Sequence, residues 1–323
     1  MKKRIFANIA LLLTAFIWGV SFVAQKAGMD YVGPFTFNFS RSILGGLSLI
    51  PVIFLVKLIK TDTRTSEVKH LQHVQLAQAG SLCGLALFTA LSIQQYCMQY
   101  STAGKAGFIS ALYIIFVPLI SMFFGKKLRK RVKFGVVLAV IGLYLLCYKA
   151  EDGFGLYDVL LMISAFFYGV HIMVVNYFSK KVDAAKVSCF QFFVVALLSL
   201  PLMLGFETPT WEAIVDCKVP LLYAGILTCG VAYTLQIFGQ KYTKPVIATL
   251  ILCLESVFAV LGGAVLLQET MNIKEIFGCI FMISAVIISE LRFPKHKIKR
   301  NNTHKSFIYK CREIRERLTR GKS

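Results

Sequence analysis

Glu255 is the side chain of this sequence best placed for chemistry, because it is a carboxylate near the centre of a long apolar stretch. The stretch 244–269 has the length of one membrane crossing, since a helix rises about 1.5 Å per residue through roughly 30 Å of hydrocarbon. An acidic group at that depth is usually kept for a cavity, a partner or a pathway. Ala259 and Gly262, one and two turns onward, are small, so we expect this face to lie inside a helix bundle. There a carboxyl group can exchange a proton for a ligand, or it can form a structural ion pair or an interhelical hydrogen bond.

Arg41 and His171 are two further ionisable groups within apolar segments. The planar fork of donors on Arg41 suits a carboxylate, either that of a substrate or that of Glu255. Alternatively, its long side chain reaches the outer headgroups. Histidine can take up or release a proton in the physiological range, but a hydrogen-bonded role in helix packing is the preferred interpretation of His171. Both residues are therefore candidates for binding a substrate or a proton.

Three aromatic residues complete the candidate site: Trp18, Tyr113 and Tyr168. Trp18 and Tyr168 either form aromatic walls of a cavity or pack two helices together. Tyr113 stands 142 residues before Glu255, at the matching position of an internal repeat. We find no cluster of His, Cys, Asp or Glu at metal-binding spacing and no Walker A sequence, so we expect no metal, no cofactor and no ATP hydrolysis. An integral-membrane enzyme is a distant alternative, because the buried polar residues are few and scattered.

The composition indicates a polytopic membrane protein. The chain has 323 residues, of which 57% are hydrophobic and 16% charged, with a mean hydropathy of +0.68. Its net charge of +20 lies between the apolar runs and in the C-terminal tail, which argues against a nucleic-acid partner. The nine cysteines lie mostly in apolar runs and form no CxxC pair, so they are expected to pack as small apolar residues. The first apolar run is too long for a signal peptide and predicts a retained helix.

Ten apolar segments predict ten transmembrane helices. They span about 5–25, 35–57, 75–97, 104–124, 133–150, 156–178, 186–205, 219–240, 245–267 and 272–291. Lys and Arg concentrate at the N-terminus, in the even-numbered loops and in the tail, which places both termini in the cytoplasm. Pro118 predicts a kink in the fourth segment.

Two halves of the sequence resemble each other. AFIWGV at 15–20 matches AFFYGV at 165–170, and an offset of 142 pairs Gln94 with Gln236 and Tyr113 with Glu255. Five helices in each half would make the second half enter the membrane inverted, as in many secondary transporters. We therefore expect an all-α integral membrane protein with a first repeat at 1–150, an inverted second repeat at 151–291 and a basic tail at 292–323. The tail either forms an amphipathic helix on the membrane surface or is a solvated segment attracted to anionic lipid.

Several of these stretches resemble a known family. The stretch 18–41, WGVSFVAQKAGMDYVGPFTFNFSR, together with ISALYIIFVPLISMFFGKKL and LESVFAVLGGAVLLQE, is similar to the EamA family of the drug/metabolite transporter superfamily. The resemblance covers roughly 5–291. Lys126 and Lys127 replace the acidic residue that usually closes the fourth segment, whereas Glu269 keeps it on the ninth. The resemblance implies ten helices in two inverted units, alternating access, and a central cavity bordered by Trp18, Arg41 and Glu255.

These observations predict a secondary active or facilitative transporter of the cell membrane, with export preferred to uptake. The expected substrate is a small metabolite, such as an amino acid or a derivative, and protons are possible coupling partners. Broad drug efflux or flipping of a lipid-linked substrate on the same fold is the alternative. The oligomeric state, monomer or homodimer, stays open.

Overall fold

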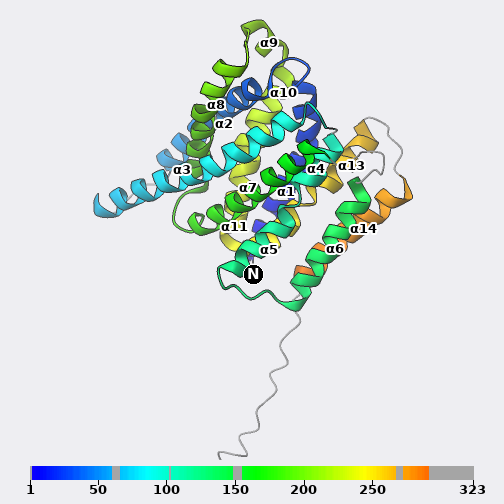
Figure 1. Ribbon diagram of the computed structural model, residues 1–323. Coiled ribbons are helices and arrows are strands. Elements are labelled where there is room, and N and C mark those ends of the chain that lie inside the picture. The colour runs from blue at the N-terminus through cyan, green and yellow to red at the C-terminus, as the bar shows by residue number, and fades with distance from the viewer. Residues whose placement is uncertain (1, 60–65, 102, 148–154, 267–271, 291–323) are drawn as a thin grey trace, which may run out of the picture. The chain divides into compact units, whose positions relative to one another are not determined.

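The computed structural model describes residues 2–59, 66–101, 103–147, 155–266 and 272–290 (Figure 1). These residues form helices and connecting turns, and no strand occurs among them. The first five helical segments are α1 (Lys2–Gly28), α2 (Pro34–Ile59), α3 (Ser66–Cys97), α4 (Ala103–Ser110) with α5 (Tyr113–Phe123), and α6 (Lys130–Cys147). The remainder are α7 (Leu156–Phe178), α8 (Ala184–Phe206), α9 (Trp211–Asp216), α10 (Lys218–Leu222), η1 (Tyr223–Ala232), α11 (Tyr233–Tyr242), α12 (Pro245–Leu252), α13 (Glu255–Leu266) and α14 (Ile273–Glu290).

Each of the ten segments expected from hydropathy corresponds to one helix or to one consecutive set of helices. Seven stretches among the described residues are long and apolar enough to cross a membrane. The other three are α6 and α14, which include charged residues, and the interrupted stretch Pro245–Leu261. The protein is therefore an all-α membrane protein, as the sequence predicts. The basic tail at 292–323 lies outside the described residues.

The helix bounds recur at fixed offsets along the chain. An offset of 150 takes the end of α1 to the end of α7, the start of α2 to the start of α8, and Pro51 inside α2 to Pro201 inside α8. An offset of 142 takes α4 to α12 and the start of α5 to the start of α13, and an offset of 143 takes α6 to α14. Figure 1 shows α6 and α14 packed side by side. The inverted arrangement of two halves stays a prediction.

Two of the apolar segments are interrupted near their middle. The turn at Ala111 and Leu112 separates α4 from α5, and the turn at Cys253 and Leu254 separates α12 from α13. The interruptions meet, because the Cys253 thiol donates to the Ala111 carbonyl oxygen at 3.6 Å. The helix is continuous through Pro118, so the irregularity of this segment lies several residues before the proline. Each interruption brings a helix start, Tyr113 or Glu255, to the middle of the bundle.

The two ends of the bundle are identified by the contacts that close them. At one end, the start of α1 meets the end of α14 through an Arg4–Glu290 ion pair and meets Thr243 through Asn8. At the other end, the Lys26 ammonium at the end of α1 donates to the Met98 carbonyl oxygen at 2.8 Å. We call these the Arg4 end and the Lys26 end.

Apolar side chains fill the half of the bundle toward the Arg4 end. The largest buried cluster contains Leu11 of α1, Val117 of α5, Ile172 of α7 and both Leu250 and Ile251 of α12. These helices come from both halves of the sequence, so close van der Waals packing of their apolar side chains holds the two repeats together at this end.

Candidate functional site

A cavity of about 40 Å³, lined by polar and aromatic side chains, lies between the middle of the bundle and the Lys26 end. Helices α1, α2, α3, α4, α5, α7, η1, α11 and α13 line it, so both halves of the sequence contribute. The lining residues are Trp18, Ser21, Phe22, Gln25, Arg41, Leu91, Gln94, Ser110, Tyr113, Tyr168, Thr228, Cys229, Tyr233 and Glu255. Five of the six candidate residues from the sequence are therefore gathered around one cavity.

Arg41 is 1% exposed and supplies the positive charge of the cavity. Its Nη1 donates to Gln25 Oε1 at 2.9 Å, whereas Nε and Nη2 have no hydrogen-bond partner. The start of α2, seven residues earlier, is held by Glu207, whose carboxylate accepts from the Phe35 and Thr36 amides at 2.8 and 2.7 Å. The rest of the fold thus fixes α2, while the guanidinium keeps two donors available. Buried donors of a guanidinium without partners are suited to a carboxylate ligand.

Glu255 is the first residue of α13 and is 4% exposed. Its Oε1 accepts a hydrogen bond of 2.9 Å from the Tyr113 hydroxyl, which belongs to the first residue of α5. The start of a helix favours a negative charge, because the amide dipoles point toward it. The sequence places these two residues 142 apart, and the fold joins them directly. No ion pair between Glu255 and Arg41 occurs in the described part of the chain, so the two charges face the same cavity separately.

Aromatic and amide groups form the rest of the lining. The Tyr168 hydroxyl donates to Gln94 Oε1 at 2.7 Å, and Gln94 Nε2 donates to the Ser110 hydroxyl at 2.8 Å. The rings of Trp18 and Tyr233 pack with centroids 4.8 Å apart, and the indole Nε1 of Trp18 has no partner. This wall combines apolar faces with hydrogen-bonding groups, as sites for amphipathic small molecules do.

His171 lies beside the cavity rather than on its surface. It is 1% exposed, its Nε2 is 3.1 Å from Gln191 Oε1, and its ring packs against Tyr233 with centroids 5.8 Å apart. This geometry matches the packing alternative considered for this histidine.

Sequence reasoning missed several lining residues. Gln94, which the sequence analysis pairs with Gln236 only through the repeat, both lines the cavity and bonds with side chains of two other helices. Gln25, Thr228 and Tyr233 were not singled out. A signal for Gln25 exists in the spacing of Ser21 and Gln25, one helical turn apart, because a second polar residue one turn from the first marks a polar face on an apolar helix.

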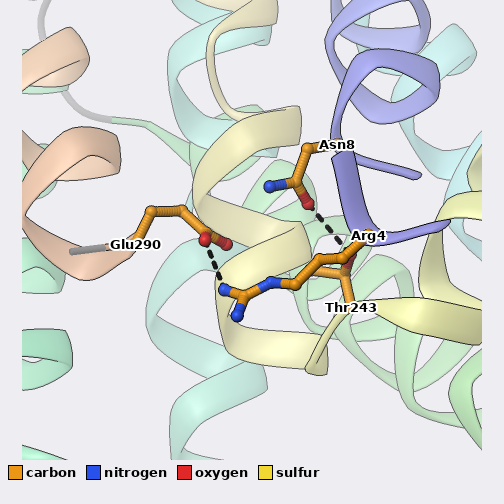
Figure 2. A network of polar contacts seen from close by, with 4 residues as sticks. All are labelled: Arg4, Asn8, Thr243 and Glu290. Carbon is orange, nitrogen blue, oxygen red and sulfur yellow. Dashed lines mark hydrogen bonds and ion pairs between the residues drawn. The ribbon is translucent and has the colours of Figure 1, made fainter. Parts of the chain in front are cut away.

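Polar networks join different segments at both ends of the bundle. Figure 2 shows the network at the Arg4 end, where Arg4 pairs with Glu290, and the Thr243 hydroxyl donates to Asn8 Oδ1 at 3.0 Å. Toward the Lys26 end, Lys105 and Asp158 form an ion pair of 2.9 Å. Asn8 and Asp158 are related by the offset of 150, so the same position of α1 and α7 contributes to each network.

A helical membrane bundle around a polar cavity is the architecture of a membrane transporter, and comparisons with known proteins bear on this assignment. Residues 5–148 and 155–291 match the EamA-like transporter family. An uncharacterized transporter of Archaeoglobus fulgidus is 32% identical over 291 residues, which cover 90% of this chain and 87% of the relative. The uncharacterized transporter YoaV of Bacillus subtilis is 23% identical over 296 residues, covering 90% and 98%.

The fold recurs in a solved protein. A crystal structure with 17% sequence identity superposes with a TM-score of 0.72 and covers 88% of this chain and 96% of the other. The chain belongs to the EamA-like transporter family, within the drug/metabolite transporter superfamily. It is a multi-pass membrane transporter of small molecules and not an enzyme, as the sequence predicts.

Proposed function

We propose that this chain is a secondary active or facilitative transporter of the cell membrane that exports an amino acid or an amino-acid derivative. Both termini lie in the cytoplasm in this proposal, so the Arg4 end faces the cytoplasm and the Lys26 end faces outward. The basic residues at the N-terminus and in the even-numbered loops support this orientation.

The observation that carries the proposal is the pair of opposite charges on one cavity. Arg41 has two unpaired donors for a carboxylate, and Glu255 can accept from an ammonium group. Trp18 and Tyr233 offer an apolar wall for a side chain. A zwitterion with an amphipathic side chain uses all three features, whereas an inorganic ion or a purely apolar compound leaves at least one charge unpaired. Unpaired buried charges are strongly unfavourable, so the lining selects for such a zwitterion.

Alternating access is the proposed cycle. The recurring helix bounds and the contact between the two interrupted segments support two inverted halves that meet at Tyr113 and Glu255. The cavity lies toward one end, and the apolar cluster fills the other, so a substrate can leave only if the halves change their packing. Glu255 is the proposed carrier of a proton, which it exchanges for the substrate ammonium.

Flux into proteoliposomes tests this proposal. The panel contains leucine and phenylalanine, their carboxamides, which lack the carboxylate, and the corresponding amines, each with and without an imposed pH gradient. We expect flux of the amino acids only, driven by the gradient. Glu255→Gln is expected to lose the gradient dependence but to keep folding and membrane insertion. Ser199→Ala is the control, because Ser199 is buried on α8 outside the cavity lining.

Other outcomes have definite meanings. Equal flux of amino acids and carboxamides would show that Arg41 does not recognise a substrate carboxylate. It would also reject amino acids as the proposed substrate class. If flux through the Glu255→Gln variant still depends on the pH gradient, Glu255 is not the carrier of the proton. If cationic dyes or lipid-linked compounds move while amino acids do not, the function is drug efflux or flipping on the same fold.

A further inference from the structure

Two glutamines of α11 are buried in the half of the bundle toward the Arg4 end. Gln236 and Gln240 are 1% and 0% exposed. Neither the Oε1 nor the Nε2 of either side chain has a hydrogen-bond partner. Within the described ranges, no other buried side chain leaves both the oxygen and the nitrogen of an amide unpaired. Buried amides are normally paired, so two fully unpaired ones on one helix need an explanation.

These amides lie on a stripe that begins at the cavity. Tyr233, Gln236 and Gln240 are spaced by three and four residues, which places them on one face of α11. Tyr233 lines the cavity, and α11 runs from there to Tyr242 near the Arg4 end. The neighbouring face is occupied, because Gly239 packs closely against Leu11 of α1. The stripe therefore runs from the cavity through the filled half of the bundle.

A third amide with an unpaired donor lies beside this stripe. Gln191 of α8 is 0% exposed, and its Oε1 contacts His171, while its Nε2 has no partner. His171 in turn packs against Tyr233. The His171–Gln191 pair and the stripe therefore border the same region, on the side of the cavity toward the Arg4 end.

The repeat offsets give these residues counterparts in the other half of the chain. Gln236 stands 142 residues after Gln94, and Gln191 stands 150 residues after Arg41. Gln94 and Arg41 both line the cavity at the Lys26 end, where both ends of the Gln94 amide are hydrogen-bonded. In two inverted halves, the residues that line the cavity at one end have counterparts that would line it at the other end.

We propose that Gln236, Gln240 and Gln191 form a second polar station on the substrate path, which takes shape when the bundle opens at the Arg4 end. Their uncharged amides would donate to the carboxylate and accept from the ammonium of the passing zwitterion. In the structure the station is closed, and its amides are unpaired. Opening supplies partners from water and substrate, so the glutamines favour the change of state. This inference rests on the alternating access proposed above.

Substitution by methionine separates this role from a structural one. Methionine keeps the volume of glutamine but removes the amide, so Gln236→Met and Gln240→Met should leave the closed state as stable as before or more stable. We expect at least tenfold slower flux, with affinity for substrate offered at the Lys26 side within twofold of the unmodified protein. Ser199→Ala, which also removes an unpaired buried polar group, should change neither flux nor affinity beyond twofold. Unchanged flux in both glutamine variants, or a fall in thermal stability parallel to the fall in flux, would overturn the proposal.

Thiol accessibility tests the station without any knowledge of the substrate. Gln236→Cys and Gln240→Cys are treated with a membrane-impermeant methanethiosulfonate, in intact cells and in inside-out vesicles, with the unmodified chain and Ser199→Cys as blanks. We expect at least fivefold faster labelling than in the blanks, only from the side of the Arg4 end. No labelling above the blanks, or labelling from the Lys26 side, would contradict the station. Labelling without amino-acid flux would keep the station and reject the proposed substrate class.

Discussion

Buried polar groups toward the Lys26 end of the bundle differ in their surroundings from those toward the Arg4 end. Toward the Lys26 end, Gln94 bonds with Tyr168 and Ser110 around an open cavity. Toward the Arg4 end, Gln236 and Gln240 are buried without any partner. Such an asymmetry is expected of a path that is formed at one end and closed at the other. The unpaired donors of Arg41 and Trp18 thus face a cavity that a ligand can occupy, whereas the unpaired amides of Gln236 and Gln240 are enclosed in the part that is closed.

The largest effect on substrate binding is expected from substitution of Arg41, because in the proposed function this residue binds the substrate carboxylate in the cavity. Arg41→Lys keeps the charge but loses the fork of donors, and Arg41→Ala loses both. We expect the Kd of Arg41→Ala for leucine to rise about 100-fold, which corresponds to about 2.7 kcal/mol and to the loss of one or two charge-assisted hydrogen bonds. The effect of Arg41→Lys should be intermediate. Calorimetry on protein in nanodiscs measures both.

The carboxamide of leucine is the matched ligand for this prediction. It keeps the side chain and the amine but has no carboxylate, so its weaker binding should change far less in Arg41→Ala. If leucine and its carboxamide lose affinity by the same factor, Arg41 supports the fold of the cavity rather than the ligand.

The next largest effect is expected on stability, at one of two glycines that are related by the offset of 150. A Cβ on Gly19 of α1 would stand 2.6 Å from the Glu255 carbonyl oxygen and 2.9 Å from the Ala259 amide nitrogen. A Cβ on Gly169 of α7 would be 3.1 Å from the nearest side-chain atom, the Cβ of Phe116. Gly19→Ala must therefore push backbone apart and should lower the free energy of unfolding by about 1–3 kcal/mol, whereas Gly169→Ala should change it by much less.

Thermal denaturation of the two variants in detergent measures this difference. Both substitutions add one methyl group within a helix, so the change in helix propensity cancels between them. Equal stability of the two variants would mean that α1 can move away from α13 without loss, and the close contact at Gly19 would then not hold the halves together.

The sequence predicts the helices well and the geometry of the cavity only in part. Hydropathy fixes the long segments because membrane thickness fixes their length. The interruptions at Ala111–Leu112 and Cys253–Leu254 have no sequence signal, since neither contains Gly or Pro, and the one proline nearby lies within a continuous helix. The pairing of Tyr113 with Glu255 could be anticipated from the repeat. The place of Gln25 beside Arg41 could not, because it depends on how α1 packs against α2.

A smaller effect is expected at the wall of the cavity. Tyr168→Phe removes the donor to Gln94 Oε1 and leaves that oxygen unpaired, which should weaken substrate binding by about 1 kcal/mol, roughly fivefold in Kd. Tyr177→Phe is the matched control on the same helix, because its side chain is exposed and it is not among the residues that line the cavity. An equal effect in both variants would argue against a role of the Gln94 network in binding.

The smallest effect is expected at the Arg4 end, where a partly exposed ion pair helps to close the bundle. Arg4 and Glu290 keep 24% and 23% of their side-chain surface exposed, and such pairs contribute only about 0.2–1 kcal/mol, less at high salt. In the Gln236→Cys background, Arg4→Gln should therefore speed thiol labelling less than fivefold, and the increase should vanish at high salt. Asn8→Ala, which breaks the neighbouring bond to Thr243, should speed labelling by a similar factor at any salt concentration, because that bond joins uncharged groups. If neither variant changes the labelling rate, the apolar cluster alone closes this end, and the polar contacts of Figure 2 only accompany the closure.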